Sequence, residues 1–289
     1  MSARRWRSEL LGEHIELALP QGRLDAFRRG AGPPLVFAHG WLANANLWRG
    51  VVDRLADRFD CIALDLPLGA HRHPLPDVDL SPAGCAALIV AALEALELEQ
   101  VTLVGNDSGG AYSQIALASA PEWVARLVLN SCETPYDQFP PPPFDGLPAA
   151  AADPVALGQL LGALRDRAVR ALPAAFGLLV KHELDPRASD SYALPCCEDE
   201  AILADTARVM ASARSEPVHA AGRLLIEGWQ QPVLFAWSPD DQVFPIANAQ
   251  RYAAALTDAR VVEIADAYSF TPEDQPAALA EVVAAFALG

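Results

Sequence analysis

Short apolar runs alternate with longer, helix-compatible segments along most of the chain. The apolar runs predict strands at 14–19, 23–28, 34–40, 61–65, 101–105, 126–130, 233–237 and 260–264. The longer segments predict helices at 47–58, 81–96, 111–120 and 246–256. Strands that alternate with helices form a mostly parallel sheet with helices on both faces. The pattern therefore predicts an α/β fold with such a central sheet.

The stretch from residue 135 to residue 228 interrupts this alternation. It begins with a proline-rich loop at 139–144 and then contains helical patterns only, at 154–167, 171–182, 198–213 and 218–227. We expect this stretch to be a helical cap that is inserted after the sixth strand and covers the carboxyl ends of the sheet, where ligands bind in such folds. The predicted domains are a core of residues 1–134 and 229–289 and a cap of residues 135–228.

Composition and charge limit the classes of binding partner. The chain has 289 residues, a length that suits one such α/β unit, and 21 basic against 37 acidic residues give a net charge of −16. This balance argues against nucleic acid and anionic membranes as partners, and no apolar run is long enough to span a bilayer. Five scattered cysteines without metal-ligand spacing indicate reduced thiols and a cytoplasmic protein. We expect a small-molecule substrate and no metal or cofactor; the oligomeric state stays open.

The segment Gly105-Asn-Asp-Ser-Gly109 carries the most specific chemical signal. It follows an apolar run and precedes a helical segment, which is the strand–turn–helix context of a nucleophile elbow. The register of that motif places Asp107 at the nucleophile position, and Ser108 falls one position later. A carboxylate nucleophile attacks an electrophilic carbon and forms an ester with the enzyme. The elbow therefore predicts that Asp107 faces an active site.

With this elbow, the chain resembles the α/β-hydrolase superfamily from residue 34 to its end. His39-Gly40-Trp41 matches the loop that supplies one oxyanion donor, at Trp41, and the Ser108 N–H would be the other donor. The segment 237–245 resembles the family's acid motif and places the acid at Asp241. The segment 264–276 is in register with the family's histidine segment, but Ser269 stands at the histidine position.

An aspartate at the elbow is typical of the haloalkane dehalogenases and epoxide hydrolases, and this chain resembles them as an atypical member. Those families usually place tryptophan where Ser108 stands, and dehalogenases commonly place asparagine where Trp41 stands. Epoxide opening in that group uses acidic tyrosines from the cap, for which Tyr136 and Tyr192 are candidates by position.

The absence of the histidine constrains the mechanism most strongly, because no histidine follows His219. A covalent ester on the enzyme needs an imidazole to activate water, and a serine hydroxyl is a poor base near neutral pH. His71 and His73, in the loop after the fourth strand, are candidates for a relocated base. His39 is a further pocket candidate, although its usual role in this fold is to hold the oxyanion loop. Glu133, just after the sixth strand, is an alternative position for the acid.

Three functions are open. The first is a hydrolase that acts through Asp107 on a small, mostly apolar epoxide, halide or ester. The second is a non-hydrolytic lyase, isomerase or cyclase in which Asp107 is a general acid or base. The third is a ligand-binding protein that has lost catalysis.

Overall fold

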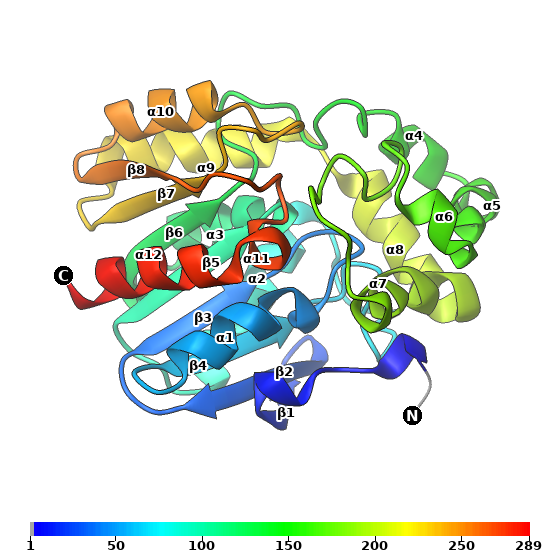
Figure 1. Ribbon diagram of the computed structural model, residues 1–289, viewed down its shortest axis with the longest axis horizontal. Helices are drawn as coiled ribbons and strands as arrows, with labels where there is room; N and C mark the ends of the chain where they lie inside the picture. The colour runs from blue at the N-terminus through cyan, green and yellow to red at the C-terminus, as the bar shows by residue number, and fades with distance from the viewer. Residues whose placement is uncertain (1–2) are drawn as a thin grey trace.

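A computed structural model describes residues 3–289 (Figure 1). The core is an eight-stranded sheet in the order β1-β2-β4-β3-β5-β6-β7-β8. The first two strands form an antiparallel hairpin, β2 pairs antiparallel with β4, and all remaining pairs are parallel. The strands are β1 Glu13–Leu19, β2 Gly22–Gly30, β3 Pro34–Ala38, β4 Asp60–Asp65, β5 Val101–Asn106, β6 Val124–Asn130, β7 Val233–Trp237 and β8 Ala259–Glu263. The predicted mostly parallel α/β sheet is confirmed.

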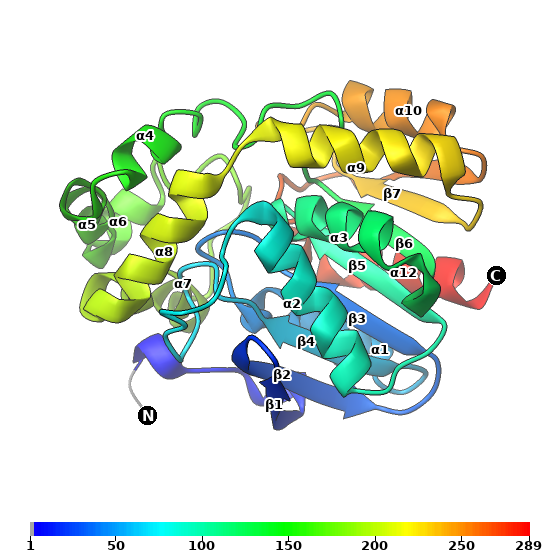
Figure 2. The same cartoon turned by 180° about the vertical axis from the view of Figure 1, so that it is seen from behind.

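Helices cover both faces of this sheet. On one face, α1 packs against α12, and on the other face α3 packs against both α2 and α9 (Figure 2). Every residue of β4 and of β5 is buried, which explains why central strands appear in the sequence as continuous apolar runs rather than alternating ones. The helices around the sheet are α1 Arg49–Leu55, α2 Pro82–Ala95, α3 Ser108–Ser119, α9 Ser215–Gly228, α10 Ile246–Ala255, α11 Thr271–Asp274 and α12 Pro276–Leu288.

A helical insertion follows β6, as predicted. Figure 1 shows its first helices as a separate layer beside the carboxyl ends of the strands, whereas α9 returns along α3 over the sheet. The helices of that layer are α4 Leu147–Ala151, α5 Pro154–Gly162, α6 Arg167–Arg170, α7 Pro186–Glu198 and α8 Glu200–Ser212. Short 3-10 turns lie at η1 Ala3–Arg5, η2 Glu9–Leu11, η3 Ala45–Trp48, η4 Pro121–Trp123 and η5 Ala163–Arg165.

The predicted helix at 171–182 is wrong, because these residues form a series of turns. Pro173 disfavours helical continuation there. At Gly177 the chain folds back so closely that a Cβ atom would lie 2.3 Å from the carbonyl oxygen of Ala171. The sequence reading also missed α7 (Pro186–Glu198), which begins after the capping residue Asp185 and contains an internal proline.

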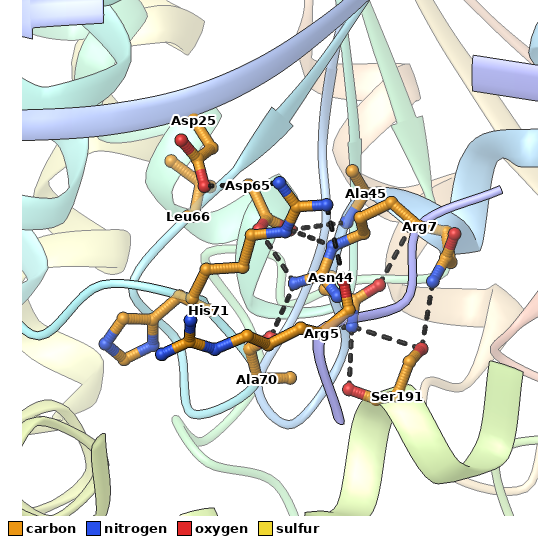
Figure 3. Close-up of polar contacts among 12 residues, drawn as sticks. Arg5, Arg7, Asp25, Asn44, Ala45, Asp65, Leu66, Ala70, His71 and Ser191 are labelled. Carbon is orange, nitrogen blue, oxygen red and sulfur yellow. Dashed lines mark hydrogen bonds and ion pairs between the residues drawn. The ribbon is translucent and has the colours of Figure 1, made fainter. Parts of the chain in front are cut away.

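A buried ion pair fastens the N-terminal segment to the core (Figure 3). Arg7 donates two hydrogen bonds to the carboxylate of Asp65 at the end of β4, at 3.1 and 2.7 Å, and a third to the carbonyl oxygen of Ala70 at 2.7 Å. Asn44 donates to the carbonyl oxygen of Ser191 in α7 at 2.8 Å. This network joins the N-terminal segment, the loop after β3 and the cap, and it thereby fixes the cap over the sheet.

Within residues 3–289, no helix combines the length and the apolar character that crossing a membrane requires.

Candidate active site

Asp107 occupies a sharp turn between β5 and α3. Its backbone has φ +54° and ψ −142°, a strained conformation for a residue with a side chain, and its N–H donates to the carbonyl oxygen of Ser131 at 3.0 Å. The turn requires small neighbours: a Cβ atom at Gly105 would lie 2.6 Å from the Cα atom of Gly110, and one at Gly109 would lie 2.4 Å from the carbonyl oxygen of Ala38. The local sequence thus forms the strand–turn–helix geometry of an elbow.

The backbone holds the Asp107 carboxyl in place. Its Oδ1 accepts the Ser108 N–H at 2.5 Å, and its Oδ2 lies so close to Gly40 that a Cβ atom there would be 2.7 Å away. The pKa of Asp107 is raised from 3.8 to about 7, mainly by the loss of hydration and also by the charge of Asp241, while the hydrogen bonds from Ser108 lower it. At neutral pH this carboxyl is therefore divided between its protonated and ionised forms.

The carboxyl faces a cavity of about 180 Å³ between the sheet and the cap. Among the described residues that line this cavity, Asp107 is the only carboxyl, and Ser108 and Tyr112 carry hydroxyl groups. The rest of the lining is almost entirely apolar and comes largely from the proline-rich loop and the cap, for example from Phe139, Phe144, Leu164, Phe176 and Met210. The cavity fits a small, mostly apolar ligand that brings its reactive carbon to the carboxyl.

The two expected oxyanion donors are present, but the protein itself provides an acceptor for each. The Ser108 N–H donates to Asp107 Oδ1, and the Trp41 N–H donates to the hydroxyl oxygen of Ser108 at 2.9 Å. The second of these bonds depends on a hydroxyl at position 108, and sequence reasoning missed it because the two residues are 67 positions apart.

The expected acid and the residue at the histidine position lie together behind the cavity wall. Asp241 Oδ1 accepts the backbone N–H groups of Val243 and Phe244 at 2.8 and 2.9 Å and the Ser269 hydroxyl at 2.8 Å. Burial raises the pKa of Asp241, while these three donors lower it. Neither Asp241 nor Ser269 is among the residues that line the cavity.

Glu133 is a third buried carboxyl in this region. It is 1% exposed, and its Oε2 has no hydrogen-bond partner among the described residues. Burial raises its pKa well above the usual range, and the nearby charges of Asp107 and Asp137 raise it further. Glu133 does not line the cavity.

Asn106 joins the elbow to the segment that carries Ser269. Its side-chain amide donates to the Ser269 carbonyl oxygen at 2.8 Å and to Asn130 Oδ1 at 3.0 Å. The sequence reading gave Asn106 no role, although one signal was present: a polar residue directly after a buried apolar strand.

The histidines have other partners. His39 Nδ1 donates to the Gly40 carbonyl oxygen at 2.9 Å, and its Nε2 accepts the Leu66 N–H at 2.9 Å. Burial lowers the pKa of His39 to about 4, so it is neutral and holds the loop after β3. His71 Nε2 lies 3.1 Å from Asp205 in α8, and His73 Nδ1 lies 2.5 Å from the Arg23 guanidinium. None of the three lines the cavity.

The two cap tyrosine candidates also lie outside the cavity. The Tyr192 hydroxyl donates to Glu273 at 2.5 Å, and Glu273 also accepts two hydrogen bonds from Arg49. The Tyr136 ring packs edge-on against Tyr252. The structure therefore brings Asp107, Ser108 and Trp41 together at one cavity, with Asp241, Ser269 and Glu133 behind it. It places the two cap tyrosine candidates and the three histidine candidates elsewhere.

Comparison with known proteins identifies the family. Residues 33–276 match the family described as alpha/beta hydrolase fold, so the chain belongs to that family. It is 25% identical over 265 residues to an uncharacterised hydrolase, YugF, of Bacillus subtilis. The aligned region covers 87% of this chain and 89% of that protein.

The solved structures show the same fold. An alpha/beta hydrolase fold protein from Burkholderia ambifaria matches with a TM-score of 0.80 and 23% identity, covering 94% of this chain and 97% of that one. The haloalkane dehalogenase DbeA from Bradyrhizobium elkani matches with a TM-score of 0.79 and 19% identity, covering 96% and 98%. Structures of an epoxide hydrolase and an esterase match as well. At these identities the likeness establishes the fold, and the predicted α/β-hydrolase fold is confirmed.

Proposed function

We propose that this protein hydrolyses a small, mostly apolar substrate (an epoxide, a halide or an ester) at Asp107, and that Asp107 acts as the general base toward water. The observation that carries this proposal is the isolation of the Asp107 carboxyl on an apolar cavity wall, with a pKa raised to about 7. A general base works best when its pKa lies near the operating pH.

The chemistry balances without a second catalytic group. The Asp107 carboxylate takes a proton from a water molecule, and the water oxygen forms a bond to the electrophilic carbon. The bond to the leaving oxygen or halide breaks, and the leaving atom takes the electron pair. With an epoxide or an ester, the leaving oxygen then takes the proton back from Asp107, which yields a diol or an alcohol and regenerates the carboxylate. With a halide, Asp107 releases the proton to solvent water.

Covalent attack by Asp107 is a second candidate, which the elbow geometry favours because the Ser108 N–H fixes one carboxylate oxygen. The ester that forms would need a base to activate water. Ser269 offers only a hydroxyl, which already donates to Asp241. His71 and His73 are held by other partners outside the cavity. Direct attack by water avoids this requirement.

A non-hydrolytic reaction, in which Asp107 moves a proton within one substrate, is supported by the apolar lining. In that reaction the Asp107 carboxyl removes a proton at one atom of the substrate and returns one at another, so that the product has the mass of the substrate. Hydrolysis instead adds the mass of one water molecule.

The test compares the wild type with Asp107→Asn on styrene oxide, 1-bromobutane and p-nitrophenyl acetate, with products and intact protein mass measured. Asp240→Asn is the matched control, because Asp240 is the aspartate next to Asp241 in the sequence, is half-exposed and does not line the cavity. We expect turnover of at least one probe to rise with pH around a midpoint of about 7. The turnover rate of Asp107→Asn should be lower than that of the wild type by about 100-fold or more, as expected for the loss of a general base. The turnover rate of Asp240→Asn should not change.

The other functions give different results. A stable protein adduct on Asp107 indicates the covalent nucleophile, and a product of unchanged mass indicates a non-hydrolytic enzyme. Binding of the probes without any conversion indicates a ligand-binding protein. Full activity in Asp107→Asn contradicts every role proposed for Asp107.

A further inference from the structure

The hydroxyl of Ser108 accepts a hydrogen bond from a backbone N–H group that matches one of the two oxyanion donors of other α/β hydrolases. In that fold, two backbone N–H groups hold the negative oxygen: that of the residue after the nucleophile and that of a residue in the loop after the third strand. Here these are the N–H groups of Ser108 and Trp41. The first donates to Asp107 Oδ1 at 2.5 Å, and the second donates to Ser108 Oγ at 2.9 Å.

Close packing holds the backbone that carries this hydroxyl. Ser108 is 2% exposed and is the first residue of α3. The next residue, Gly109, approaches β3 so closely that a Cβ atom there would lie 2.4 Å from the Ala38 carbonyl oxygen. The Gly110 N–H donates to the Asp107 carbonyl oxygen at 2.7 Å. These contacts hold the backbone at the start of the helix, so residue 108 stays next to Trp41, and the hydrogen bond to Trp41 orients its hydroxyl.

A substrate carbonyl can reach the Trp41 N–H only by displacing an acceptor that the protein already holds there. Exchanging one hydrogen bond for another yields little net free energy, because a typical bond contributes only about 1 kcal/mol. An open donor, in contrast, is worth a factor of about 10²–10³ in the rate of reactions that form a tetrahedral oxyanion. The wild-type site thus lacks an effect that ester hydrolysis depends on.

We infer that Ser108 is a specificity-determining residue whose hydroxyl closes the oxyanion hole, so that the site disfavours carboxylic esters and acts on substrates that react at saturated carbon. Opening an epoxide or displacing a halide places no charge on a carbonyl oxygen and does not need the Trp41 N–H. This inference rests on the proposed role of Asp107 and narrows the three substrate classes to two.

The experiment removes the hydroxyl and looks for a gained activity. Ser108→Ala and Ser108→Gly each free the Trp41 N–H, and both are compared with the wild type on p-nitrophenyl acetate. Ser113→Ala is the matched control, since it removes a buried hydroxyl from the same helix, and that hydroxyl donates to the Gly109 carbonyl oxygen at 2.7 Å. Thermal unfolding verifies that each variant is folded, and the use of two variants at position 108 guards against the failure of one.

We expect kcat/KM for the ester to rise about 10-fold to 100-fold in at least one folded Ser108 variant, while the wild type and Ser113→Ala stay near the buffer rate. A merely structural role for Ser108 would lower activity and would not create a new one. Two results overturn the inference: ester hydrolysis in folded Ser108 variants no faster than in the wild type, or a wild type that already hydrolyses the ester faster than it converts styrene oxide and 1-bromobutane.

The double variant Asp107→Asn/Ser108→Ala separates this inference from the proposed function. If the gained ester hydrolysis disappears in the double variant, Asp107 is its base, and both the proposed function and the inference about Ser108 are supported. If the gain persists, Ser108 closes the hole but Asp107 is not the base. If Asp107→Asn abolishes turnover of the other probes while no Ser108 variant gains ester hydrolysis, the proposed function stands and the inference about Ser108 falls.

Discussion

Replacing Asp107 with asparagine should stabilise the folded protein at alkaline pH. The pKa of Asp107 is about 7 in the folded protein, against 3.8 for a hydrated aspartate. At about 1.4 kcal/mol per pH unit, ionising this carboxyl in the folded state costs about 4 kcal/mol more than in the unfolded chain. Asp107 is half-buried and faces a cavity that admits water. We therefore expect Asp107→Asn to raise the free energy of unfolding at alkaline pH by about 2–4 kcal/mol.

The sign of the effect follows from proton binding. Between about pH 4 and pH 7 the folded protein keeps a proton on Asp107 that the unfolded chain has released, so this group lowers stability as the pH rises through that window. Asparagine keeps an oxygen that accepts the Ser108 N–H but has no charge to bury. The variant and the wild type should therefore be equally stable near pH 4 and should diverge up to about pH 8.

Urea denaturation of both proteins, followed by circular dichroism at several pH values, measures this difference. Glu133 and Asp241 also have raised pKa values and are present in both proteins. Removal of the Asp107 charge lowers the pKa of Glu133, which acts in the same direction as the predicted stabilisation. Asp240→Asn serves as the control and should show no such divergence. The reasoning is refuted if Asp107→Asn is no more stable than the wild type near pH 8.

Three further variants test other parts of the structure. Arg7→Ala leaves the buried carboxylate of Asp65 without its cation and should lower the free energy of unfolding by about 3–5 kcal/mol in urea; a loss below about 1 kcal/mol contradicts this. Asp241→Asn removes a charge that raises the pKa of Asp107, so the midpoint of the pH–rate profile should move below about 7, and an upward move would be inconsistent with the site. Tyr192→Phe should keep turnover within about 3-fold, because its hydroxyl lies outside the cavity; a loss of about 100-fold or more would restore the cap tyrosine as an acid.

The sequence predicted the fold well because that fold has local signals. The buried central strands appear as continuous apolar runs, and the elbow requires glycines at fixed positions around Asp107. The cap was predicted less well. Its turns at 171–182 result from a close backbone approach at Gly177, which the pattern of apolar and polar residues does not indicate. The helix α7 contains a proline, a residue that normally argues against a helix.

The candidate site was predictable as a list of positions but not as a set of contacts. Asp107, Trp41 and Ser108 are aligned by motif, yet the hydrogen bond from Trp41 to the Ser108 hydroxyl depends on how two distant loops meet. The candidate bases His71 and His73 come from a loop near the crevice, but their side chains have partners in α8 and on β2. Chain order places a loop at one end of a sheet and does not fix the direction of its side chains.

A single turnover in water enriched in oxygen-18 tests the role of Asp107 most directly. The enzyme in excess is mixed with whichever of the probes it converts, and the oxygen isotope is measured in the product and in the peptide that contains Asp107. General-base catalysis predicts the heavy isotope in the product of the first turnover and none in the Asp107 carboxyl. An unlabelled first product together with a labelled Asp107 carboxyl would show that a covalent ester forms and would contradict the account.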